Sequence, residues 1–166
     1  GYIRDIPLNK RRNVGFGLGL GYSYNNYRQN MQVSENQDGN GFKIIPFEEI
    51  ETNRFSIHLV ETPIEFRWRT STDTKYSFWR IYAGVKFGYI FYSKEVALSS
   101  GEEIIVTNMK SLENFRYGLS FSAGHGSLNF NIYYGLNNLF KDGSETVLGE
   151  QIELKQINVG LMFYML

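Results

Sequence analysis

The residues best suited to chemistry are charged side chains placed at alternate positions of otherwise apolar stretches. Alternate residues of an extended strand share one face, so these charges would project together. Buried charges are stable only when they are paired. We therefore predict a lumen charge network, with a path for protons or solutes as the alternative. Its members are Glu61, Glu65, Arg67, Arg80, Lys86 and Arg116.

The two histidines give a weak signal for catalysis. A rim-active membrane hydrolase needs a histidine beside a serine or aspartate. Ser56 and His58 share the inward parity of their stretch without a diagnostic spacing, and His125 lies between two glycines, which is typical of a solvated turn. The chain has no cysteine, no phosphate loop and no cluster of metal ligands. We expect no enzyme activity, no catalytic residue, no cofactor and no metal.

The stretch 13–28 shows which elements must position these residues. Its even positions are apolar or aromatic from Val14 to Tyr24, whereas its odd positions from Gly15 to Gly21 are glycines. A period of two predicts a strand with one apolar and one small or polar face. Glycine on a pleated face suits the close approach of backbone inside a narrow barrel. The aromatic face is then the outer one, in lipid, which predicts a transmembrane β-barrel.

Similar alternation recurs along the chain. Between Leu59 and Ile64 the apolar residues change parity, and a β-bulge within 60–63 would restore one continuous apolar face. The other expected strands are 1–6, 52–68, 78–93, 115–123, 128–136 and 157–165.

The connections alternate between short and long. Short turns are expected near Pro7, Ser71 and His125, and longer ones at 29–50, 95–111 and around Lys141. Outer-membrane barrels have short periplasmic turns and longer external loops. If both termini are periplasmic, one strand precedes Gly1. We predict an all-β, antiparallel up-and-down transmembrane barrel of about eight strands, whose side chains fill the lumen and oppose a solute path. We expect the first strand to be missing from this chain and residues 1–166 to form a single, N-terminally incomplete domain.

Composition fits this class of protein. The 166 residues include 12 Tyr, 13 Phe and 2 Trp, as aromatic girdles require, and the formal net charge of zero does not favour nucleic acid as a partner. No apolar run approaches the length of a transmembrane helix. A soluble lipocalin-like barrel or a β-sandwich would show similar alternation. The glycine-lined polar face and strands of about fifteen residues favour the membrane barrel.

The connection 29–50 contains an unusual number of apolar residues for an exposed loop. They either extend a hairpin above the membrane or dock on another outer-membrane protein, and we predict docking. These candidate partner-loop residues are Met31, Val33, Phe42, Ile44, Ile45 and Phe47.

Two neighbouring segments carry a family resemblance. Residues 59–69, LVETPIEFRWR, followed by residues 79–89, WRIYAGVKFGY, resemble the PorT family of outer-membrane barrels. The opening RDIPLNKRRN, residues 4–13, resembles the preceding turn in members from gliding Gram-negative bacteria. The chain ends at Leu166, where barrel assembly signals often have an aromatic residue. The resemblance implies a barrel of about eight strands and, for the founding member, a role in type IX protein secretion, but no catalytic residues.

These observations together predict a non-enzymatic outer-membrane barrel that acts as an accessory or structural component of an envelope protein complex, related to type IX secretion. The alternative is a small rim-active membrane enzyme or a lipid-binding barrel. The expected location is the outer membrane of a Gram-negative bacterium, with both termini periplasmic. The expected partners are outer-membrane lipid and other outer-membrane or periplasmic proteins, and not nucleic acid.

Overall fold

A computed structural model describes residues 1–28, 31–34, 41–44, 50–70, 79–99, 102–146 and 153–163. Every regular element in these ranges is a β-strand, which confirms the all-β class. The strands are β1 (Tyr2–Pro7), β2 (Val14–Arg28), β3 (Met31–Ser34), β4 (Gly41–Ile44), β5 (Ile50–Arg69), β6 (Trp79–Ser99), β7 (Glu102–Thr107), β8 (Phe115–His125), β9 (Leu128–Gly135), β10 (Glu145–Thr146) and β11 (Ile157–Phe163).

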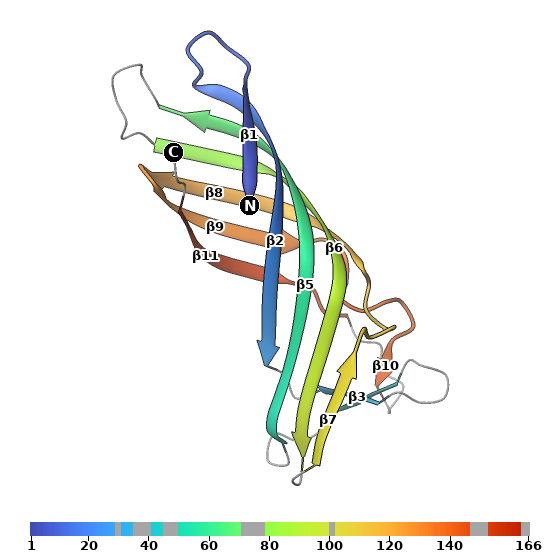
Figure 1. Cartoon of the computed structure of the whole chain (residues 1–166). Coiled ribbons are helices and arrows are strands. Elements are labelled where there is room, and N and C mark those ends of the chain that lie inside the picture. The colour runs from blue at the N-terminus through green and yellow to red at the C-terminus, as the bar shows by residue number, and fades with distance from the viewer. Residues whose placement is uncertain are drawn as a thin grey trace.

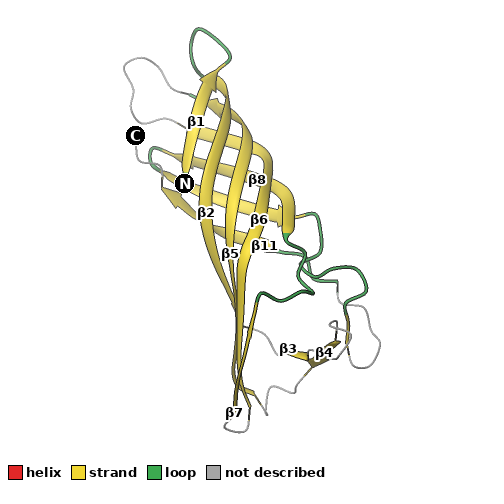
Figure 2. Ribbon diagram, turned by 45° about the vertical axis from the view of Figure 1, so that its right-hand side comes forward, coloured by secondary structure: helices red, strands yellow, loops and turns green. Residues whose placement is uncertain are grey.

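Most strands join one antiparallel, eight-stranded sheet. Its order is β1-β2-β5-β6-β8-β9-β11, and β7 pairs with the far end of β6. Consecutive strands of this wall are neighbours in space, so the up-and-down arrangement is confirmed. The wall curls strongly, but no pairing joins β1 to β11 among the described residues, so the sheet is not closed (Figures 1 and 2).

The sheet has two unlike ends. At the end that we call the turn end, residues 8–13 join β1 to β2, and Gly126 and Ser127 alone join β8 to β9. Gly126 has a φ of 61°, which a glycine adopts without strain. At the opposite loop end lie β7 and a separate three-stranded sheet of β10, β4 and β3 (Figure 1).

The wall between the two ends is apolar outside and polar inside. Burial alternates residue by residue along β8, where Arg116, Ser120 and Ser122 are buried and their neighbours are exposed. This pattern is the reverse of a soluble protein and matches a wall that faces lipid. The exposed outer residues include Phe16, Leu18, Leu20, Phe66, Trp68, Ile81, Phe87, Leu119, Phe121, Phe130, Ile132, Val159 and Leu161.

Two strands continue well beyond this apolar wall. β5 has 20 residues and β6 has 21. At about 3.3 Å per residue each is about 65–70 Å long, roughly twice the thickness of a bilayer core. In this extension the inward positions of β5 from Phe55 to Leu59 become apolar, and Phe55, Ile57 and Leu59 are completely or almost completely buried. They form a loop-end core with Ile90, Met109, Leu112, Leu139 and Phe140.

This change of environment overturns the predicted bulge in β5. Leu59 and Glu65 lie on the same inner face, so the strand keeps one parity throughout. Its apolar residues do not form one lipid-facing surface. Those nearer the turn end face lipid, whereas those nearer the loop end face the loop-end core. Of the two register shifts between β5 and β6, one lies between Ile50 and Thr52, and the other lies where His58 pairs with Tyr92 and Leu59 pairs with Ile90. The extra residue at the second shift is therefore Phe91, in β6.

The expectation that residues 95–111 form a connection is also wrong. β6 continues to Ser99, and β7 returns antiparallel to it from Glu102 to Thr107. The apolar runs 96–98 and 104–106 were present in the sequence, but they are short, and the segment was assigned to a connection.

Candidate functional site

The strongest charge cluster lies on the inner face near the turn end. The Arg67 guanidinium donates from Nε and Nη2 to Oε2 of Glu65, at 3.0 and 2.9 Å. Its Nη1 is 3.4 Å from Oδ1 of Asp5, and Arg69 pairs with the other oxygen of Asp5. Glu65 and Arg67 are only 5% and 6% exposed, so this Glu65–Arg67 cluster is shielded from water. The Arg67 carbon Cζ also lies 4.6 Å from the ring centre of Tyr82.

A second pair lies deeper along the same face. The Lys86 Nζ atom is 3.5 Å from Oε2 of Glu61, and the Ser23 hydroxyl donates to the same oxygen at 2.5 Å. Lys86 also stands 5.0 Å from the ring centre of Tyr133. Both charged side chains are about a fifth exposed, 20% for Lys86 and 19% for Glu61, so solvent weakens this pair more than the first.

Arg80 and Arg116 complete the predicted network but stand outside these two pairs. They are 2% and 1% exposed. Arg116 donates from Nη1 to the backbone carbonyl of Asn138 at 2.5 Å, while its Nε and Nη2 have no hydrogen-bond partner among the described residues. The six residues that the sequence singled out thus share one inner face, where the structure pairs Glu65 with Arg67 and Glu61 with Lys86.

Glycines make room for the cluster at the turn end. Gly17, Glu65 and Gly84 lie side by side on β2, β5 and β6. A Cβ atom on Gly17 would stand 2.4 Å from Nε of Arg67. A Cβ on Gly84 would stand 2.0 Å from the carbonyl oxygen of Ile64 and 2.7 Å from the Cα of Glu65. The inner-face glycines therefore admit the guanidinium at one position and the neighbouring backbone at the other.

Sequence reasoning missed several partners of these charges. Asp5 falls in the expected strand 1–6 but was not counted among the inner-face charges, yet it pairs with Gly17 as part of β1 and faces inward. The signal was the alternation of Ile3 and Asp5 with Tyr2, Arg4 and Ile6, which is too short to be decisive alone. The contributions of Ser23, Arg69, Tyr82 and Tyr133 depend on the strand register, which the alternation does not specify.

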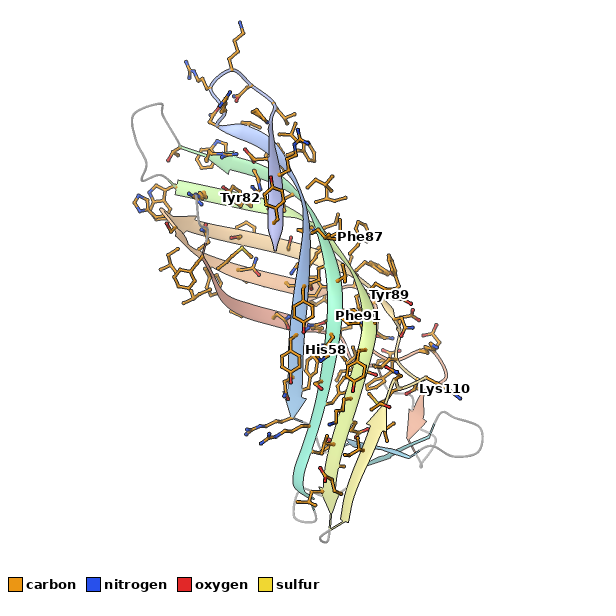
Figure 3. The ribbon with its side chains drawn as sticks, in the orientation of Figure 1. His58, Tyr82, Phe87, Tyr89, Phe91 and Lys110 are labelled. Carbon is orange, nitrogen blue, oxygen red and sulfur yellow. The ribbon has the colours of Figure 1, made fainter. Side chains whose placement is uncertain are left out.

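His58 lies among aromatic rings on the outer face, so its predicted inward orientation is wrong. Its Nδ1 atom is 2.7 Å from the hydroxyl of Tyr22, and its ring centre lies 5.0 Å from that of Tyr24 and 5.3 Å from that of Tyr92. The cause is the same change of environment along β5, because His58 alternates with the inward Ile57 and Leu59. Rings at this level are typical of an interfacial aromatic belt (Figure 3).

The other candidates for chemistry do not assemble into a site. The Ser56 hydroxyl donates to the backbone carbonyl of Lys94 at 3.2 Å, and His125 ends β8 with its ring centre 5.3 Å from that of Trp79. Among the residues that the structure describes, no group of three or more histidines and carboxylates could hold a metal ion. Within the same residues, no helix is long and apolar enough to span a membrane.

The candidate partner loop is described only in part. Met31 and Val33 lie in β3, and Phe42 and Ile44 lie in β4. Met31 pairs with Ile44 and Val33 with Phe42, while β10 extends the sheet on the other side of β4. Ile45 and Phe47 lie outside the described residues. The loop thus contains a hairpin at the loop end, separate from the main wall.

An up-and-down sheet with an apolar outer wall and paired charges inside defines a transmembrane β-barrel of the outer-membrane class. Comparison with known families agrees with this class. The chain belongs to the family described as outer membrane protein beta-barrel domain, whose model matches residues 1–141. No curated protein and no solved structure matches the chain. β11 lies beyond the matched residues, yet it pairs with β9 over its whole length.

Proposed function

We propose that this chain is a non-enzymatic outer-membrane barrel that serves as an accessory or structural component of an envelope protein complex. The observation that carries the proposal is the extension of β5, β6 and β7 beyond the apolar wall. A strand of 9–11 residues is enough to cross a bilayer, so about ten residues of β6 lie outside it. Backbone ordered at that distance from the membrane is suited to holding another protein.

The same proposal assigns the inner face a structural role. The Glu65–Arg67 cluster and the Glu61–Lys86 pair neutralise charge inside a narrow wall. His58 has a phenol and aromatic rings as neighbours, an arrangement that supplies no nucleophile. Both observations favour binding over catalysis.

Type IX secretion is the pathway that we propose for this complex. The supporting observation is the resemblance to the PorT family in residues 59–69 and 79–89. These two segments pair with each other in β5 and β6, from Val60 opposite Tyr89 to Arg69 opposite Arg80. The resemblance therefore concerns two adjacent strands of the membrane wall, one of which carries Glu65 and Arg67.

We further propose that the turn end, where β11 ends beside Leu128, faces the periplasm and that the loop end is external. The short connections at the turn end support this orientation. Because the chain has no cysteine, single substitutions give unique labels. A membrane-impermeant maleimide should label Asp142→Cys on intact cells and should label Ser127→Cys only after the outer membrane is opened. Labelling of Ser127→Cys alone on intact cells would reverse the orientation.

The partner interaction is tested by removing the hairpin that contains β3 and β4. Deletion of residues 31–47 should leave a heat-resistant barrel on gels but abolish the co-purification of partner proteins in mild detergent. The hairpin pairs only with β10 among the described strands, so the main wall keeps all of its own strand pairing. The matched control is Lys10→Ser with Arg11→Ser, which removes exposed charge from the turn end and should leave the partners bound. If the deletion variant keeps its partners and the control loses them, the basic turn is the binding surface.

A further inference from the structure

A cavity of about 500 Å³ opens on the outer side of β6, at the boundary between the apolar wall and the loop end. One side is β6 around its bulge, and the other is the connection between β7 and β8. Its floor is aromatic and its rim carries two cations and an amide. The residues that define it are Tyr89, Phe91, Tyr92, Lys110, Asn114 and Lys141.

The backbone around this cavity is held by hydrogen bonds. Beyond the bulge, the carbonyl of Ser93 accepts from the Asn108 amide at 2.9 Å, and the Ser93 hydroxyl accepts from the Met109 amide at 3.0 Å. Before the bulge, the Ile90 amide donates to the carbonyl of Asn114 at 2.8 Å. The connection that carries Lys110 is therefore fastened to β6 on both sides of the extra residue.

The backbone of the second cation, Lys141, is held against the loop-end core. The Lys141 amide donates to the carbonyl of Ser111 at 2.8 Å, and Leu112 pairs with Phe140. Leu112 and Phe140 are 1% and 2% exposed, whereas the side chains of Lys110 and Lys141 are exposed. Both lysines thus extend from backbone that is hydrogen-bonded next to buried residues, which reduces the entropy lost when both engage one ligand.

The positive charge of this cavity distinguishes it from the neighbouring cavity. Within the described part of the chain, neither lysine has a carboxylate partner within 4 Å. A neighbouring cavity of about 480 Å³ has the opposite character, since Glu113, Asp142 and Glu153 line it. An anion that approaches this part of the rim would therefore be directed to the lysine cavity.

The position of the cavity at the margin of the apolar wall indicates which kind of anion it binds. Tyr89 and Phe91 are 55% and 52% exposed on the lipid-facing side of β6, and Lys110 lies beyond them toward the loop end (Figure 3). Exposed aromatics at a wall margin lie at the level of lipid headgroups, and lysines beyond them reach the headgroup charge. We propose that this cavity binds a membrane lipid whose phosphate-bearing headgroup has a net negative charge, in the leaflet at the loop end. The acyl chains lie along Phe91, Tyr89 and Phe87.

The test uses the whole chain folded into phosphatidylcholine vesicles that contain a small fraction of phosphatidic acid. After gentle transfer to detergent, native mass spectrometry counts the lipid retained by each protein molecule. Lys110→Gln and Lys141→Gln should each lower the retention of phosphatidic acid about fivefold, and the double variant about thirtyfold, as expected for cations near a charged lipid surface. Lys155→Gln, an exposed lysine of the neighbouring cavity, removes the same charge and should retain lipid like the unmodified chain.

Two further arms identify the ligand. Diacylglycerol with the same acyl chains should not be retained, and free inorganic phosphate should not displace bound phosphatidic acid, because it has no chains to contact the aromatic floor. Equal retention by the double variant and the unmodified chain, with heat resistance on gels showing that both are folded, would overturn the proposal. Displacement by phosphate alone would also overturn it, since the site would then bind the free anion.

Discussion

Replacing Glu65 with alanine is expected to destabilise the folded barrel by about 3–5 kcal/mol, the largest electrostatic effect expected from the ion pairs of the described residues. The change leaves Arg67 buried with Asp5 as its nearest remaining carboxylate, at 3.4 Å. Asp5 already pairs with Arg69 through its other oxygen. Two arginines would then share one carboxylate on a face from which water is largely excluded. Urea unfolding in lipid vesicles, followed by tryptophan fluorescence, measures the loss.

Two variants separate the lost ion pair from other causes. Glu61→Ala removes a carboxylate whose pair is longer and about a fifth exposed, so it should reduce stability by about 1 kcal/mol or less. Glu65→Ala combined with Arg67→Met removes both charges of the pair and should recover most of the stability, because Arg67 is then no longer a buried cation that has lost its nearest carboxylate. If Glu65→Ala alone unfolds within about 1 kcal/mol of the unmodified chain, the cluster is not the electrostatic support of the wall.

The sequence predicted the wall of the barrel well because lipid imposes a simple rule. Wherever one strand face meets lipid and the other meets the interior, apolar and polar residues alternate with a period of two. In β2 and β8 this alternation continues without interruption, and the observed burial follows it. The alternation of short and long connections likewise predicted that consecutive strands are antiparallel neighbours.

Prediction failed where the environment of a strand changes along its length. In β5 the outer residues Phe66 and Trp68 face lipid, whereas Phe55 and Ile57 face a core. Apolar character alone does not distinguish these two environments, so the parity change appeared to require a bulge in the wrong strand. The same error gave His58 the wrong, inward orientation. Both errors, the predicted bulge and the orientation of His58, would have been avoided if the extension of β5 and β6 beyond the membrane had been known.

The charged face shows a second limit of sequence reasoning. Alternation indicated which residues share the inner face, but pairing depends on the register between strands. Glu65 and Arg67 are two residues apart on one strand, so their proximity was accessible from sequence. The contribution of Asp5 could not be predicted from sequence. Asp5 lies on β1, where it pairs with Gly17 of β2, so it has no direct pairing with β5. Register is set by side-chain packing across the whole sheet.

The second large effect is expected from Gly84→Ala, which should destabilise the barrel by about 3 kcal/mol or more, at the upper end of overpacking. The added Cβ would stand 2.0 Å from the carbonyl oxygen of Ile64 and 2.7 Å from the Cα of Glu65. Both are backbone atoms of the adjacent strand, so a side-chain rotation cannot relieve the clash. β5 and β6 must separate at the row that carries Glu65, which also disturbs the ion pair with Arg67.

Gly88→Ala is the matched control. Gly88 lies on the same strand and the same face as Gly84, two residues beyond Lys86. Its added Cβ would meet the Cβ of Arg116 and the Cδ2 of Leu59 at 3.5 Å, which is ordinary contact. The control should therefore unfold in urea close to the unmodified chain, while Gly84→Ala unfolds at clearly lower urea. Equal stability of the two variants would show that the inner-face glycines are not required for strand approach. Their abundance in 13–28 would then need an explanation other than the space they leave.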